Sequence, residues 1–198
     1  MSELTRAIPF NDADVLERVL DDVGDRVAAL ILEPAMMNIT IVAPRPGYLE
    51  RIRELTARHG VMLVFDEVKT GMTIAAGGAV ERFGVRPDIV CLAKAIAGGY
   101  PSGAVGMTEP LADLITTGRV RQVGTFNGNP LSMAAAQAAL TEVLTDDAYA
   151  SLNPKAKSYE SIKRLSDSEI LTLALLQQLR GARSAPGGGF LGGRCCGR

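Results

Sequence analysis

Two short apolar runs, each leading into a charged residue, constrain this 198-residue chain most. The first is VMLVF at residues 61–65, which is followed by Asp66, and the second is DIVCLA at residues 88–93, which is followed by Lys94. Short runs rich in branched side chains and bounded by Gly and Pro are typical of buried strands in a parallel sheet. We therefore expect an acid and a lysine at the carboxyl ends of two such strands, the edge where open α/β sheets bind ligands.

The combination of Lys94 with Asp66 favours the chemistry of a carbonyl cofactor. A lysine amine partly withdrawn from water loses proton affinity and becomes a nucleophile that can form a Schiff base. A carboxylate beside the same cofactor can keep a pyridine nitrogen protonated, which is how proteins tune pyridoxal phosphate. The plainer alternative is two solvated charges at strand ends, but Gly-rich chain follows both charges, which favours a ligand site.

The remaining pattern predicts helices and strands in alternation, and therefore an α/β fold with a mostly parallel sheet and right-handed crossovers. We expect a loop between the strands at 61–65 and 88–93. His59, the single histidine, is expected to complement the dipole at a helix end rather than to take part in catalysis. The expected helices are 11–23, 47–59, 110–116 and 130–144, and the expected strands are 27–32, 61–65, 88–93 and 105–107.

Composition argues against several classes of partner. The formal net charge is −1, which gives no field of one sign to attract nucleic acid or an anionic membrane. The apolar runs are far shorter than the ~20 residues that a membrane span needs, and no signal peptide is visible at the N-terminus. Three cysteines and one histidine make neither a disulfide framework nor a metal site, so we expect a reducing, cytoplasmic setting.

Three ordered motifs resemble the class III pyridoxal-phosphate aminotransferases, in particular the branch similar to glutamate-1-semialdehyde aminomutase. They are FDEVKTG at 65–71, GGAVERFGVRPDIVCLAKAIAGGYPSGAVG at 77–106 and GTFNGNPL at 124–131. The resemblance covers about residues 5–150. It implies the central part of a three-layer, fold-type I large domain over residues 1–150, with pyridoxal 5′-phosphate as cofactor.

The resemblance also implies residue roles. Lys94 would form the Schiff base and move a proton, Asp66 would pair with the pyridine nitrogen, and Val68 would pack on the ring face. Asn38 occupies a position beside the cofactor, where its plainer interpretation is a turn residue. Gly124 and Thr125 would bind the cofactor phosphate of a neighbouring subunit, so a homodimer acting on an amino acid or an amino-aldehyde is expected.

Several features depart from the family. Lys69 stands where an uncharged residue is usual, and a second cation there would compete with Lys94 or alter its pKa. We expect Lys94 to be the more buried of the two lysines and the ammonium of Lys69 to swing out to water. The phosphate loop, the ring-stacking aromatic residue and the small C-terminal domain of the family are not found in this sequence.

The segment 151–198 differs in character from the rest of the chain. Its first part contains an expected helix at 167–179 and resembles a short segment of insertion-sequence transposases, and its end is a Gly/Arg-rich, low-complexity tail. We expect it to be unrelated to the aminotransferase part and partly disordered. Two hypotheses therefore stay open: an aminotransferase or aminomutase that works through Lys94, and a catalytically inactive remnant of an interrupted gene.

Overall fold

The computed structural model describes residues 4–39 and 41–143 of the chain. The described helices and strands, in chain order, are α1 (Ala13–Val23), the short 3-10 helix η1 (Gly24–Arg26), β1 (Ala29–Leu32), α2 (Tyr48–Arg58), β2 (Met62–Asp66), α3 (Gly78–Phe83), β3 (Ile89–Ala93), the 3-10 helix η2 (Lys94–Ala97), β4 (Gly103–Met107), α4 (Glu109–Thr116) and α5 (Pro130–Val143). Asp12 caps α1 through its side chain, and Asn129 accepts bonds from two amides in the first turn of α5.

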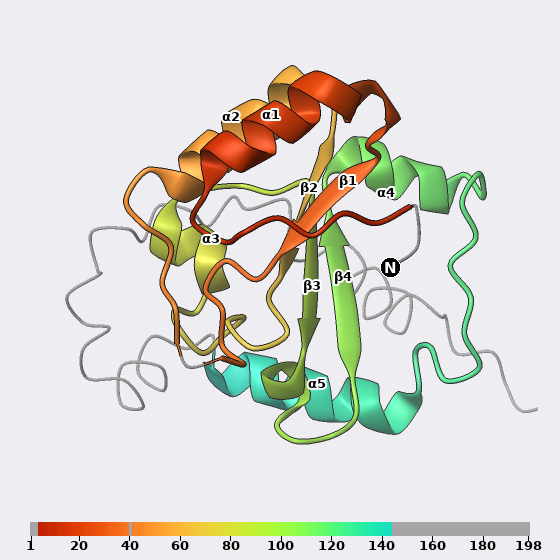
Figure 1. Ribbon diagram of the computed structural model, residues 1–198. Helices are drawn as coiled ribbons and strands as arrows, with labels where there is room; N and C mark the ends of the chain where they lie inside the picture. Colours follow the sequence, from red (N-terminus) through yellow and green to blue (C-terminus); the bar gives the residue numbers. More distant parts are fainter. Residues whose placement is uncertain (1–3, 40, 144–198) are drawn as a thin grey trace, which may run out of the picture.

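Four strands form one sheet in the order β1-β2-β3-β4 (Figure 1). The first three run parallel, with Leu32 beside Phe65 and Asp66 beside Cys91, and β4 returns antiparallel to β3. The expected α/β fold with a mostly parallel sheet is therefore confirmed. Because β1, β2 and β3 are parallel, their carboxyl ends point to one edge of the sheet, downward in Figure 1, and the loops that follow them gather there.

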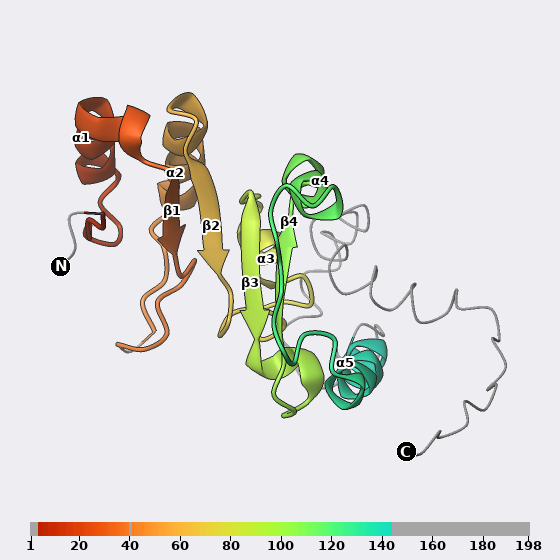
Figure 2. The same ribbon diagram turned by 90° about the vertical axis from the view of Figure 1, so that its right-hand side faces the viewer.

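The main core lies on the face of the sheet that α1, α2 and α3 cover. Alternate residues of β2 point into it, and both Leu63 and Phe65 are fully buried there. A second apolar cluster joins Val90 and Leu92 of β3 to η2 and α5. Figure 2 shows α1 and α2 beside the β1–β2 side of the sheet and α5 beside η2.

Two expectations about this part of the chain were wrong. The segment between β2 and β3 contains α3, whose six residues are too few to show a helical period in the sequence. β1 is not a buried strand, because Ile31 on the face opposite α1–α3 is 63% exposed. The other α-helices and strands lie within two residues of the expected bounds, and the 3-10 helices η1 and η2 were not predicted. Leu144 and the whole of 151–198 lie outside the described residues, so the expectations for that segment stay predictions.

Candidate active site

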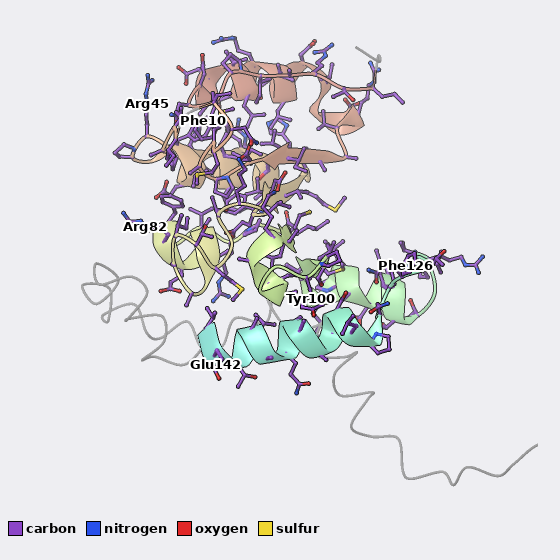
Figure 3. The ribbon with its side chains drawn as sticks, turned by 90° about the horizontal axis from the view of Figure 1, so that it is seen from below. Phe10, Arg45, Arg82, Tyr100, Phe126 and Glu142 are labelled. Atoms are coloured by element: carbon purple, nitrogen blue, oxygen red, sulfur yellow. The ribbon has the colours of Figure 1, made fainter. Side chains whose placement is uncertain are left out.

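Four of the residues that the sequence singled out lie at the carboxyl edge of the parallel strands. Asn38 lies in the loop after β1, Asp66 ends β2, Val68 follows it by two residues, and Lys94 is the first residue after β3. Figure 3 views the molecule from this side, with α5 running along one flank of the edge and Tyr100 beside it. The topology therefore gathers a carboxylate, an amine and an amide from three different connections.

Asp66 lies on the face of the sheet that α1, α2 and α3 leave uncovered. It alternates with Phe65, which points into the core, and it is half-buried. One carboxylate oxygen, Oδ1, accepts a bond from the Val68 backbone N–H at 3.1 Å, which fixes the turn after β2. Across the ladder, the Asp66 charge faces Cys91. The pKa of the Cys91 thiol is raised mainly by burial and additionally by this charge.

Glu67, which the sequence reasoning missed, anchors the same turn from the other side of the sheet. It is 2% exposed, and its carboxylate accepts bonds from the Ala79 backbone N–H at 2.7 Å and the Thr70 hydroxyl at 3.1 Å. Burial raises the pKa of this carboxyl, and the hydrogen bonds oppose the shift. The signal was available, because adjacent residues at the end of a strand point to opposite faces, so one acid of an Asp-Glu pair must meet the core.

Lys94 is exposed, which contradicts the expectation that its amine would be withdrawn from water. No hydrogen bond or ion pair to its side chain occurs within the described part of the chain. Its backbone φ is +51°, a left-handed conformation that is unusual for a residue with a side chain and is concentrated at functional sites. The backbone therefore turns sharply at the lysine, while no element of residues 4–39 or 41–143 buries the amine.

Lys69, rather than Lys94, is the lysine whose ammonium is bound by other residues, which is the opposite of what the sequence led us to expect. It is half-buried, and its ammonium donates to the side-chain oxygen of Asn38 at 2.5 Å and to the Met37 carbonyl at 3.5 Å. The sequence did not show this because the partners lie some thirty positions earlier and meet Lys69 only through the parallel pairing of β1 with β2.

Gly124 and Thr125 are not part of this edge. Both are exposed, in the loop between α4 and α5 that runs along the outer side of β4 (Figure 1). The turn is well defined, because the Asn127 N–H bonds the Gly124 carbonyl and a side chain at Gly124 would lie 2.6 Å from Asn127 Oδ1. Phe126, which follows Thr125, projects beside α4 (Figure 3).

The donor set at the edge suits pyridoxal phosphate in part. Lys94 offers a primary amine for an aldehyde, and Asp66 keeps one carboxylate oxygen without a backbone bond in the described residues, which suits a protonated ring nitrogen. Gly124 and Thr125, the predicted phosphate donors, lie on another part of the surface, so of the predicted cofactor contacts the described edge brings together Lys94, Asp66, Val68 and Asn38 but not the phosphate donors.

The described residues lack two other features that would indicate a different function. No group of three or more His, Cys, Asp or Glu side chains there is placed to hold a metal ion. None of the helices at 13–143 is long and apolar enough to cross a membrane.

Comparison with known proteins gives a consistent result. The family model for class-III aminotransferases matches residues 4–187. The chain is 51% identical over 140 residues to a glutamate-1-semialdehyde 2,1-aminomutase of Methanospirillum hungatei, a match that covers 70% of this chain and 34% of the relative. The chain thus spans about a third of the length of the curated relatives that it matches.

Solved structures agree in fold. A glutamate-1-semialdehyde aminomutase from Pseudomonas aeruginosa, solved as a variant in complex with PMP, is 35% identical with a TM-score of 0.65, covering 79% of this chain and 36% of that one. A β-phenylalanine aminotransferase from Variovorax paradoxus is 33% identical with a TM-score of 0.69, covering 76% of this chain and 35% of that one. The fold type I interpretation is therefore confirmed, and the chain belongs to the class-III aminotransferase family.

Proposed function

We propose that the chain contributes the carboxyl-edge site of a pyridoxal-phosphate-dependent enzyme of amino-group transfer, of the transaminase or glutamate-1-semialdehyde aminomutase type. The observation that carries this proposal is the placement of Asp66 and Lys94 at the ends of β2 and β3 in a member of the class-III aminotransferase family. The PMP-bound Pseudomonas aeruginosa relative supports the cofactor, since PMP is the amine form of pyridoxal phosphate.

In this proposal, each residue at the carboxyl edge of the sheet has a separate role. Lys94 binds the cofactor aldehyde through its amine and holds the proton that is moved at the substrate carbon. Asp66 keeps the ring nitrogen protonated, and the N–H bond from Val68 fixes the orientation of its carboxylate while the Val68 side chain packs on the ring. The cofactor, when bound, supplies the electron sink for the chemistry.

Substrate and assembly follow from the same proposal. The substrate is an amino acid or an amino-aldehyde, and Asn38 faces it or the cofactor from the loop after β1. Gly124 and Thr125 bind the cofactor phosphate of a second copy in a homodimer. Exposed apolar side chains on both sides of Thr125, Val123 at 79% and Phe126 at 80%, support a protein contact there.

The proposal extends to a domain boundary and to the cellular location. We also propose a boundary near residue 150 between the aminotransferase part and the segment 151–198, although the family match runs on to residue 187. Cys91 is a free thiol, which is consistent with a reducing cytoplasm. Limited proteolysis with mass mapping tests the boundary, and fractionation of the source cells tests the location.

Reductive trapping tests the central proposal. The chain is mixed with pyridoxal phosphate, reduced with borohydride and mapped by peptide mass. We expect one adduct, on Lys94, which Lys94→Ala removes and Lys69→Met leaves in place. An adduct on Lys69, or none on Lys94, would overturn the assignment. Free cofactor with an unrelated lysine-containing protein of equal concentration gives the background level.

One observation favours the second hypothesis, that of an inactive remnant. Lys94 is exposed, and no part of residues 4–39 or 41–143 withdraws its amine from water. Amino transfer is therefore assayed with several amino acids and with glutamate-1-semialdehyde. Turnover well above that of free cofactor rejects the remnant. Trapping on Lys94 without turnover supports a site that binds the cofactor but does not complete the reaction.

A further inference from the structure

Three side chains form a continuous hydrogen-bonded series beside the candidate site. The Glu33 carboxylate accepts from the Met37 N–H at 3.1 Å and from the Asn38 side-chain N–H at 3.3 Å. The oxygen of the same Asn38 amide accepts from the Lys69 ammonium. The series therefore connects the end of β1, the loop after it, and the turn that follows Asp66.

The chemistry of the two end groups fixes the orientation of the amide between them. An ammonium can only donate and an ionised carboxylate can only accept, so the Asn38 oxygen must face Lys69 and its nitrogen must face Glu33. One N–H of Asn38 has no partner among the described residues. Asn38 can thus offer the site a hydrogen-bond donor, while its acceptor oxygen is occupied.

Lys69 also ties this loop to the turn after β2. The loop closes on itself through the paired backbones of Met36 and Val42, whose two bonds measure 3.0 and 2.9 Å. Its far end is otherwise exposed, with Ile39 at 61% and Ile41 at 71%. Beyond that backbone pair, two bonds restrain the Asn38 side chain within the described residues, one to the Glu33 carboxylate and one from the Lys69 ammonium.

We propose that Lys69 is a positioning residue, which fixes the Asn38 amide and the loop after β1 against the turn that carries Asp66. In this role Lys69 is not a rival of Lys94 for the cofactor aldehyde, because its ammonium is committed to Asn38 and Met37. The use of Asn38 by a bound ligand rests on the proposed function. The restraint itself does not, so it is tested on the chain without cofactor.

The first test follows the side-chain amide of Asn38 by NMR in chain labelled with ¹⁵N-asparagine. Lys69→Met keeps the length of the side chain but removes its donor. We expect the Asn38 amide resonances to move and their hydrogen exchange to become about fivefold faster. Lys69→Arg, which keeps a cationic donor, should restore both. Asn11 is the matched control, because its side chain bonds the Ala43 carbonyl and the Arg45 N–H and has no contact with Lys69.

A second test does not depend on a variant of Lys69. Competitive acetylation compares the labelling of Lys69 with that of Lys94, which is exposed and serves as the reference. We expect Lys69 to be acetylated more slowly than Lys94 in the parent chain. In Asn38→Ala, the acetylation rate of Lys69 relative to that of Lys94 should rise about fivefold. Unchanged Asn38 resonances in Lys69→Met, equal movement of Asn11, or labelling of Lys69 unaffected by Asn38→Ala would each overturn the proposal.

Discussion

The buried carboxylate of Glu67 occupies the space that a side chain at Gly78 would need. Gly78 has a φ of +64°, and a Cβ built there would overlap Glu67 Oε2. The same oxygen accepts the N–H of Ala79, so the start of α3 is held directly against the end of β2. Since Asp66 precedes Glu67, this contact fixes one end of the turn on which the candidate site is built.

Gly78→Ala should therefore destabilise the chain strongly. The left-handed backbone costs a residue with a Cβ about 1–2 kcal/mol, and overlap with a buried group adds about 1–3 kcal/mol. We expect a total loss of about 2–5 kcal/mol in the free energy of unfolding, measured by urea denaturation. Gly84→Ala is the matched control at the other end of α3, because its φ is +72° and nothing lies within 4 Å of its Cβ. Equal losses in the two variants would show that Glu67 is not the cause.

The raised pKa of Glu67 predicts a specific pH dependence of stability. Burial shifts the pKa in the folded chain above the ordinary 4.5, so the folded state holds a proton that the unfolded state releases. The contribution of Glu67 to stability is therefore greatest at low pH, and it falls as pH rises from about 4.5 through the raised value. The free energies of unfolding of the parent and of Glu67→Gln are measured by urea denaturation across this pH range. As pH rises, the free energy of unfolding of the parent should fall relative to that of Glu67→Gln. A difference that is constant with pH would contradict this.

The sequence predicted the strands and the positions of Asp66 and Lys94 at their ends better than it predicted the surroundings of these side chains. Apolar runs ending in Asp66 and Lys94 were enough to place both at one edge, because parallel pairing brings strand ends together. The burial of the two lysines was predicted the wrong way round. Burial depends on what covers a side chain, and the partners of Lys69 come from the distant loop after β1. Period-2 alternation at the end of β2 would have identified Glu67 as the buried acid, had it been extended one residue past Asp66.

The charge of Asp66 should be detectable through Cys91. The carboxylate faces the thiol across the β2–β3 ladder and, together with burial, raises its pKa. Asp66→Asn removes the charge and leaves the burial, so the Cys91 pKa should fall part of the way toward its ordinary value. The rate of Cys91 alkylation is measured against pH in a chain whose Cys195 and Cys196 are replaced by Ser. With Asp66→Asn, the increase of this rate with pH should begin at a lower pH than it does without that substitution. A Glu33→Gln control, at the end of the neighbouring strand, should leave the profile unchanged. An unchanged profile in Asp66→Asn would mean that the carboxylate does not face the thiol.

Exposed apolar side chains around Thr125 predict that the chain associates through the loop between α4 and α5. Val123 and Phe126 are nearly as exposed as free residues, and burying Phe126 in a protein contact would gain about 1.5–3 kcal/mol. Light scattering at tens of micromolar should therefore show dimers or larger species, and Phe126→Ser should shift them toward monomer. Leu4→Ser is the control, because Leu4 is 95% exposed but lies near the N-terminus. A stable monomer of the parent chain, or equal effects of the two variants, would reject this contact.

Mixing two inactive variants tests whether Thr125 serves the site of the other copy. Lys94→Ala lacks the amine that the cofactor needs, and Thr125→Ala lacks the proposed phosphate donor, so each variant alone should trap little cofactor. In a mixed dimer, the copy that keeps Lys94 receives an intact Thr125 from its partner, and one complete site is restored. Random pairing of equal amounts in a two-fold dimer should recover about a quarter of the parent's trapped adduct, all of it on the Thr125→Ala chain. If Thr125 acted within its own copy, or not at all, mixing would recover nothing beyond the sum of the two variants.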